Sequence, residues 1–469
     1  MADEKVKIYD GDLGDVIKYI EEMDESESLY DGDSAEQLQA IYDGEHVILS
    51  RADKTVLKDG KQTTVHTAKV ALNYQEDIVE SAIAFLLGKP VTINKDSDGG
   101  EDAFEFLTSA LNDMHFHSRC KKLARKLFVQ QRAAKLYFIK NPDGAKEDQK
   151  ISSIVLSQEN GEFFAIFDGT GDMEAFLRKY KVKRLVEGKA KEVELCELYT
   201  AEKIIYGESQ NGKWVATTPM INPYGKIPVV YYEQDKPEWK SVQSIVDETE
   251  LSYSKLIDTV DYFSRPKLTV AGRVTNLPDK GEVGEILQME IIDTPGGGTV
   301  ASEAKYLTWE ERSESQKLMF DLAEKYIYQF SSSAALDFLN MIQSNIGELS
   351  GSALEVLMLK PIMKAYRKQE LWGEMLKREI SVVMAILGTM DAKYAKDFST
   401  MKISLTFNSI LPDNISSIID DLVQAKQGGI LSTETAVEYN PVVKNVTQEK
   451  DRLKAEKAVN PLDSIAGAN

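Results

Sequence analysis

The stretch from Ser350 to Leu387 constrains the fold more than any other part of the chain, because its pattern predicts one very long helix. Apolar residues recur there at steps of three, four or multiples of these, with Glu, Lys and Arg between them. At ~1.5 Å per residue the helix would span roughly 55 Å, more than a typical globular domain needs. Pro361 lies inside it and removes a backbone donor, so we expect a kink at that point. The apolar positions are Leu354, Leu357, Met358, Ile362, Tyr366, Trp372, Met375, Leu376, Ile380, Val383 and Leu387.

A polar segment, LDFLNMIQSNIGELSG, comes directly before this helix. It is rich in amides and hydroxyls, and a glycine stands at each end of GELSG. This composition is typical of a loop that leads into a helix N-terminus, with Ser350 or Ser352 as the cap. A long kinked helix with a polar loop at its head suggests a scaffold rather than a catalytic domain.

The first 45 residues are strongly acidic. They hold fifteen acids and three lysines, out of a net charge of −20 for the whole chain. Val16–Met23 and Ala35–Tyr42 are short helical candidates there, between turns rich in Asp and Gly. We interpret residues 1–45 as a solvated, partly disordered arm.

Helical patterns and then a mostly β region follow this arm. Apolar spacing predicts a helix over Tyr74–Leu87 and one or two more over residues 102–135. From about 150 to 234 short alternating runs predict a mostly antiparallel sheet, with turns at Asp168-Gly169-Thr170-Gly171 and Asn211-Gly212.

Two further amphipathic helices, over residues 242–263 and 310–330, flank a small β-rich insert. Each helix has one apolar stripe and a polar reverse side, so each buries one face against something. After the long helix come a strand over residues 402–407 and three short helices. Together the elements predict an α+β fold.

Composition limits the partners and the cellular location that we expect for this protein. An acidic chain is ill suited to grip nucleic acid by neutralising phosphates along its whole surface. The two cysteines, Cys120 and Cys196, are too few for a disulfide framework. We expect both thiols to be reduced, as in an intracellular protein, and to be buried as packing residues. The N-terminus lacks the pattern of a secretory signal, and no apolar run approaches the ~20 residues that span a bilayer. We therefore expect a protein made and used in the cytoplasm, or in something assembled there, with no membrane partner.

Motifs of catalysis are missing from the sequence, which contains no GxxxxGK[ST], GxSxG or HExxH pattern. His115 and His117 would share a face on a strand, but their segment has a helical pattern, so we interpret them as surface or packing residues. We expect no catalytic residues, no metal and no cofactor. A structural or interaction protein is the preferred interpretation. The alternatives are an intracellular scaffold or adaptor, and a hydrolase using paired acids.

Three stretches, in this order, resemble the portal proteins of tailed double-stranded DNA bacteriophages. Residues 73–93, with Asn73, Ile78-Val79 and FLLGKPVTI, are similar to the family's "N…IV…yllGkPv" signature. GKIPVV at 225–230 leads through Asp247 to Pro266, and LSGSAL at 349–354 is similar to "SGvAlk". The resemblance covers roughly residues 40–455.

The resemblance implies a portal-type subunit with an α/β wing, a two-helix stem, a small β-rich clip, a long kinked helix and a helical crown. By analogy the parts are an acidic arm (1–45), wing (46–236), first stem helix (237–264), clip (265–309), second stem helix (310–336), tunnel loop (337–349), long helix with wing strand (350–412), and crown with tail (413–469).

The resemblance also implies partners and sites. It implies a ring, usually of twelve subunits, at one capsid vertex of the virion, assembled in the host cytoplasm. The channel passes double-stranded DNA in packaging and ejection, and the ring binds the terminase large subunit, the scaffold and major capsid proteins, and a head–tail adaptor. DNA-facing loop residues would be Asn340, Gln343, Ser344 and Asn345, and motor-facing clip residues Arg273, Asp279, Lys280 and Glu282.

Overall fold

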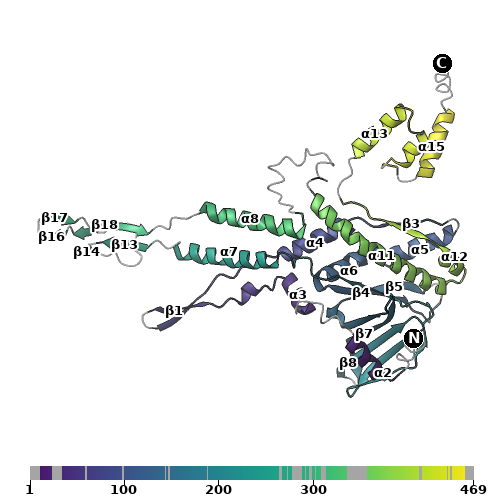
Figure 1. Ribbon diagram of the computed structural model, residues 1–469, viewed down its shortest axis with the longest axis horizontal. Coiled ribbons are helices and arrows are strands. Elements are labelled where there is room, and N and C mark those ends of the chain that lie inside the picture. Colours follow the sequence, from purple (N-terminus) through teal and green to yellow (C-terminus); the bar gives the residue numbers. More distant parts are fainter. Residues whose placement is uncertain are drawn as a thin grey trace.

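The computed structural model describes residues 11–23, 34–58, 61–97, 100–142, 144–145, 148–186, 189–263, 267–271, 273–276, 288–290, 292–294, 298–300, 303–307, 313–334, 356, 358–410, 415–440, 442–443 and 446–459. These residues mix helices and sheets, which confirms the predicted α+β class. Figure 1 shows a body of helices and sheets from which an arm of two helices projects.

Two antiparallel sheets lie in the body, as the alternating sequence pattern predicts. The larger has the strand order β10-β9-β8-β7-β6, with β11 paired to β9, and the smaller has the order β12-β4-β5. The predicted turn at Asn211-Gly212 joins β9 to β10 with positive φ at both residues, as a tight hairpin requires. The bounds are β4 Arg132–Lys140, β5 Lys150–Leu156, β6 Glu162–Phe167, β7 Met173–Val186, β8 Lys189–Thr200, β9 Lys203–Gln210, β10 Lys213–Ala216, β11 Met220–Ile221 and β12 Val229–Glu233.

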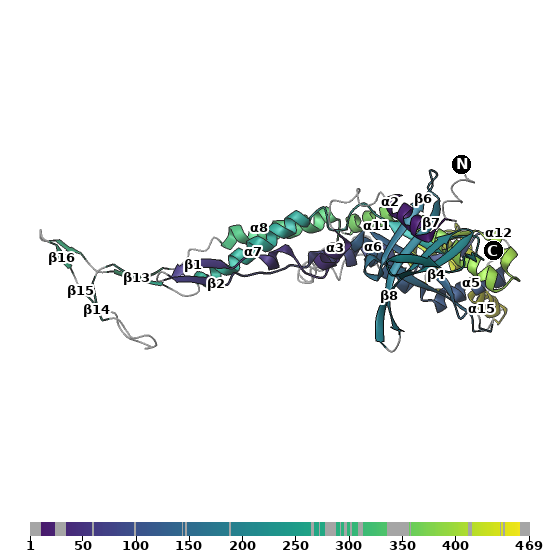
Figure 2. The same ribbon diagram turned by 90° about the horizontal axis from the view of Figure 1, so that it is seen from below.

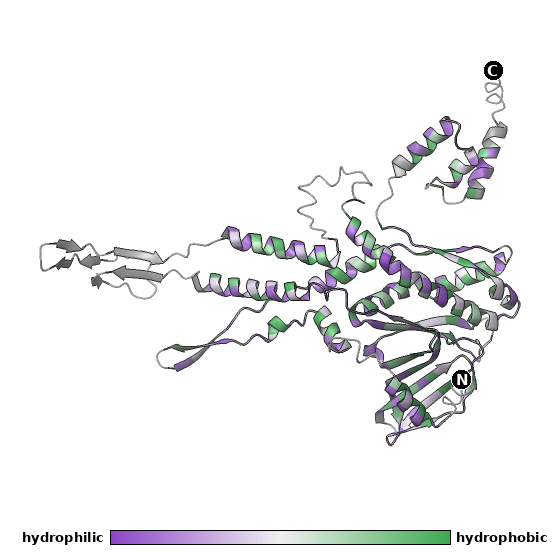
Figure 3. Cartoon of the chain, viewed as in Figure 1, coloured by the Kyte–Doolittle hydropathy of each residue, from purple (hydrophilic) through white to green (hydrophobic). Residues whose placement is uncertain are grey.

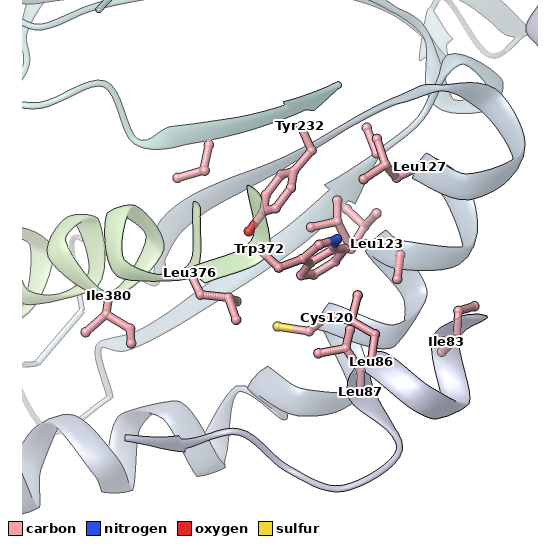
Figure 4. Packing of buried hydrophobic residues seen from close by; sticks show 14 of the residues in the cluster. Ile83, Leu86, Leu87, Cys120, Leu123, Leu127, Tyr232, Trp372, Leu376 and Ile380 are labelled. Carbon is pink, nitrogen blue, oxygen red and sulfur yellow. The ribbon is translucent and has the colours of Figure 1, made fainter. Parts of the chain in front are cut away.

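Four helices pack with the smaller sheet around the main apolar core: α4 (Tyr74–Leu87), α5 (Glu101–Asp113), α6 (Phe116–Gln130) and α11 (Leu359–Met390). Figure 4 shows Trp372 of α11 among Leu123, Cys120 and Tyr232. Both cysteines are buried, which confirms their interpretation as packing residues, and Tyr232 and Trp239 are buried as well.

The long helix differs from its prediction at its N-terminal end. α11 begins at Leu359, so Pro361 lies in its first turn. The amide of a residue in the first turn has no partner within the helix, so proline fits there without breaking a hydrogen bond. The residues before Leu359 that were predicted to share this helix lie largely outside the described residues, so the kink at Pro361 stays a prediction. The predicted caps, Ser350 and Ser352, lie outside the described residues.

The two predicted N-terminal helices exist, but the interpretation of residues 1–45 as a solvated arm is wrong for the part that the structure describes. α2 (Leu13–Met23) packs on the larger sheet and buries Leu13, Val16, Ile17 and Ile20 against it. α3 (Ala35–Tyr42) opens with a capping box at Ser34, and Leu38 joins the main core. Acidic composition concealed these two apolar faces, each only one to three turns long.

The two-helix arm that projects from the body consists of α7 (Gln243–Phe263) and α8 (Ser313–Ser331), which lie side by side (Figures 1 and 2). Between them the chain forms the predicted small β insert of three antiparallel strand pairs, β13–β18, β14–β15 and β16–β17. The bounds are β13 Lys267–Ala271, β14 Arg273–Asn276, β15 Gln288–Glu290, β16 Ile292–Thr294, β17 Gly298–Val300 and β18 Glu303–Leu307.

Three smaller units complete the described chain. β1 (Lys54–Lys58) and β2 (Lys61–Val65) form an antiparallel hairpin that lies apart from α7 in Figure 1. β3 (Thr92–Lys95) pairs with β19 (Ile403–Thr406), which joins the segment after α12 (Ala395–Thr400) to the N-terminal half. The C-terminal helices are α13 (Ile415–Gln427), α14 (Thr433–Glu438), which is capped by Ser432, and α15 (Val446–Val459).

Candidate functional site

Most of the site residues named from the sequence lie outside the described residues. This holds for the four loop residues Asn340, Gln343, Ser344 and Asn345, and for the clip residues Asp279, Lys280 and Glu282. Arg273 is the first residue of β14, where its backbone lies opposite Glu290 of β15. The described part of the chain therefore directs attention to a different feature, the two-helix arm.

The arm is fixed to the body through α4 at its root. The rings of Tyr74 and Tyr328 meet edge to face, with their centroids 6.1 Å apart. Gln75 donates to Gln243 of α7 at 3.2 Å, and the amide of Ala334, just after α8, donates to Ser81 Oγ at 3.1 Å. Both arm helices are thus held by one helix of the body.

Farther out, α8 presents an apolar stripe to solvent. Leu318, Leu322, Tyr326 and Phe330 follow one another at intervals of four residues, so they share one face of the helix. Leu318 is 59% exposed and Phe330 is 56% exposed, and the rings of Tyr326 and Phe330 stack at 5.7 Å. Figure 3 shows such hydrophobic residues alternating with hydrophilic ones along the arm. A continuous row of exposed apolar side chains is typical of surfaces that contact another molecule.

The opposite flank of α8 is charged, while a third face packs on α7. Phe320 meets Tyr253 of α7 edge to face at 5.7 Å. The charged residues Glu314, Lys317, Asp321 and Glu324 recur at steps of three and four, away from the apolar stripe. One helix therefore carries an internal contact, an apolar flank and a charged flank.

Exposed apolar side chains also lie on α7 and at the start of α11. Tyr253, Ile257 and Val260 share one face of α7, and Leu359, Met363 and Tyr366 share one face of α11. These surfaces have the chemistry of subunit contacts, since they offer area for burial and little hydrogen bonding.

A buried histidine links the arm to the loop after α3. His46 Nδ1 meets a carboxylate oxygen of Glu250, and His46 Nε2 lies 3.0 Å from the carbonyl oxygen of Ile41. Both ring nitrogens thus face acceptors, which favours the imidazolium form. Burial lowers the pKa of His46, but the hydrogen bond and charge of Glu250 outweigh burial and raise the pKa above its ordinary value of 6.5.

Three polar residues of α7, spaced four apart, hold the extended chain that follows the hairpin. Four residues of a helix advance ~6 Å along its axis, and two residues of an extended chain advance ~6.6 Å. Acceptors four residues apart on the helix therefore lie opposite every second amide of the extended chain. The bonds are Leu72 N to Glu250 Oε1 (2.8 Å), Val70 N to Ser254 Oγ (3.1 Å) and Ala68 N to Asp258 Oδ1 (2.6 Å). The sequence contains this spacing, but the identity of the amides it binds depends on the tertiary fold.

A second polar cluster lies inside the body, where both charged side chains are 0% exposed. Lys135 Nζ lies 2.8 Å from Glu379 Oε2, and the hydroxyls of Tyr137 and Tyr232 each donate to that carboxylate at 2.9 Å. Burial raises the pKa of the adjacent Cys120 thiol to about 12, so it stays protonated. Solvent does not reach this pair, and its role is to fix α11 on the smaller sheet.

The described residues offer no group of three or more His, Cys, Asp or Glu side chains that could hold a metal ion. His117 lies in α6, and His115 precedes that helix with positive φ. No described helix is both long and apolar enough to cross a membrane.

Comparison with known proteins identifies relatives of the chain. The family model described as "Phage portal protein, SPP1 Gp6-like" matches residues 22–460. The "Portal protein" of Bacillus phage SPP1 is 24% identical over 301 residues, which are 60% of this chain and 56% of that protein. The match thus spans little more than half the length of the curated relative. A chain from the solved structure "Neck of empty GTA particle computed with C6 symmetry" aligns with a TM-score of 0.40 and 11% identity, over 84% of this chain and 96% of that chain.

Proposed function

Because the chain belongs to the phage portal protein family, whose model spans residues 22–460, we propose that it forms a ring at one vertex of a phage capsid. Double-stranded DNA passes through this ring during packaging and ejection. The ring has twelve subunits, the number that the family resemblance implies. The protein works as a structural channel and not as an enzyme.

The apolar stripe of α8 is the observation that carries this proposal. A subunit in a ring uses two different surfaces, one toward each neighbour, so its contacts are heterologous and close on themselves. The apolar flank of α8 and the apolar face of α7 around Ile257 are two such surfaces on one arm. In the ring the stripe of one subunit packs on the α7 face of the next.

The charge of the chain suits a channel through which DNA slides. Each phosphate that a protein neutralises adds affinity, and tight binding would hinder movement. A net charge of −20 per subunit repels the duplex from most of a wall. We assign transient contacts with the phosphates to the neutral loop residues Asn340, Gln343, Ser344 and Asn345.

Force and assembly come from partners in this proposal. The sequence has no phosphate-binding GxxxxGK[ST] motif, so the terminase large subunit supplies ATP hydrolysis. It docks on the clip, at Arg273, Asp279, Lys280 and Glu282. The scaffold and major capsid proteins surround the ring in the host cytoplasm, and a head–tail adaptor binds it in the virion.

Native mass spectrometry and negative-stain microscopy of Leu322→Asp test the ring. The buried aspartate would have to lose its hydration at the subunit contact, so we expect rings of the natural protein and monomers of the variant. Lys317→Asp, a change to the same residue on the charged flank of the same helix, is the matched control and should still form rings. Monomers or dimers of the natural protein, without a central hole, would instead support an adaptor.

The loop assignment has a separate test. Replacing Asn340 and Asn345 together by lysine adds phosphate contacts, so packaging should slow or stall at low salt and recover as salt rises. Replacing the same two residues by serine is the control, since it keeps neutral polar side chains. If the lysine variant packages DNA at the natural rate, the loop does not contact the DNA and the assignment is wrong.

A further inference from the structure

We propose that the β1–β2 hairpin of one subunit clasps the α8 helix of the adjacent subunit, a second copy of this chain. This inference rests on the proposed ring and assigns a role to a segment that the ring proposal does not use. Its evidence is the exposure, anchoring, charge and length of the hairpin.

The hairpin is exposed along its described length. Every residue of β2 is exposed, Leu57 of β1 is 76% exposed, and Val65 of β2 is 46% exposed. An isolated two-stranded hairpin is marginally stable at best in water. A persistent hairpin of this kind gains its stability from contact with another surface.

The base of the hairpin is nevertheless anchored firmly. The Arg51 guanidinium lies 3.1 Å from Asp258 of α7 and donates to the Ala68 carbonyl oxygen at 3.0 Å. Thr67, on the returning strand side, donates to the Asp53 carboxylate at 3.2 Å. Together with the three α7 acceptors already described, these bonds fix the direction in which the hairpin leaves α7.

The hairpin and α8 use different faces of α7. Tyr253 contacts α8, whereas Ser254 and Asp258 hold the base of the hairpin. Ile257 lies one helical turn from both Tyr253 and Ser254 and is exposed between those faces. A helix of a neighbour that packs on Ile257 is therefore bordered by the hairpin on one side.

Charge and length agree with a neighbouring α8 as the occupant. Residues 54–65 contain three lysines and one aspartate, whereas α8 contains three carboxylates and two lysines. Five strand residues span roughly 17 Å. The stripe from Leu318 to Phe330 covers twelve steps of a helix, or roughly 18 Å. A basic, partly apolar hairpin thus matches a helix that carries more carboxylates than lysines and an apolar stripe of similar length.

Site-specific crosslinking tests the clasp. The native cysteines are buried, so Leu57→Cys subunits and Leu318→Cys subunits can be mixed, assembled and treated with a short bis-maleimide. We expect covalent dimers that contain one subunit of each kind. Leu185→Cys, an equally exposed leucine on the β7–β8 ribbon, replaces Leu57→Cys in the matched control and should give no dimers with Leu318→Cys.

A charge test accompanies the crosslinking. Lys61→Glu should raise the protein concentration needed for half-assembly about threefold, because one attractive contact becomes repulsive. Lys54 is left unchanged, since its Nζ lies 3.8 Å from Asp258 of the same subunit. Rings that form normally in this variant and give no Leu57–Leu318 dimers overturn the clasp but leave the ring proposal standing. Failure of the natural protein to form rings overturns both, so ring formation by the natural protein separates the two cases.

Discussion

The body and the two-helix arm treat apolar and charged side chains in opposite ways. The body buries Trp372, Ile380 and even the charged pair Lys135–Glu379, whereas the arm leaves a row of large apolar side chains in solvent. A buried ion pair with every hydrogen bond made is stable only in a finished interior. An apolar stripe that stays exposed to water has an unfavourable free energy of hydration, which burial against another surface would remove. The body is therefore complete as a single chain, whereas in the proposed ring the arm is completed by other copies.

Removal of one member of the buried ion pair should have the largest effect. Glu379→Ala leaves Lys135 buried without a counter-charge, so we expect about 3–5 kcal/mol loss in the free energy of unfolding, measured by denaturant titration. The double change Glu379→Leu with Lys135→Met removes both charges and should be far closer to the natural protein. A small loss in Glu379→Ala would mean that water reaches the pair.

Paired truncations compare the two regions directly. Ile380→Ala in the body should lower the free energy of unfolding by about 2–5 kcal/mol, because it leaves a cavity. Leu318→Ala on the arm should change monomer stability by less than about 0.5 kcal/mol, since the side chain is already exposed. The free energies of unfolding of both variants are measured at protein concentrations too low for the subunits to assemble. Equal losses would contradict the distinction between a complete body and an incomplete arm.

The cap of α3 tests how firmly the acidic N-terminal region belongs to the body. Ser34→Ala removes the hydrogen bond to the Gln37 amide and should cost about 1 kcal/mol in the free energy of unfolding. Ser34→Asp keeps a capping acceptor and serves as the control. An unchanged free energy of unfolding in Ser34→Ala would mean that α3 is only loosely attached to the body.

The smallest effect is expected at His46, where body and arm meet. Because the folded pKa of His46 is raised, its contribution to stability is fully present below its unfolded value of 6.5. That contribution disappears as the pH rises through the higher folded pKa. Thermal unfolding between pH 6 and pH 9 should show this fall, and His46→Gln should flatten it. The same pH dependence in both proteins would assign the effect to other groups.

Sequence patterns predicted the elements that depend on local periodicity. The arm helices, the β insert between them, the antiparallel sheets and the short C-terminal helices all follow from apolar spacing and turn residues. The start of α11 at Leu359 was not evident from spacing, because apolar residues recur at helical intervals on both sides of Pro361. Acidity misled at α2, where four apolar residues are enough to dock a short helix on a sheet.

By itself the sequence determined the family, the helical and β segments, and which faces are apolar, because these depend on residues close together in the chain. Only the tertiary structure decided which apolar faces find a partner within the chain: Ile380 does, and Leu318 does not. It also placed Glu379 against Lys135, and Glu250 against His46 and Leu72, across more than 170 residues of chain in each case. Long-range contacts of this kind depend on the packing of whole elements, which no local pattern encodes.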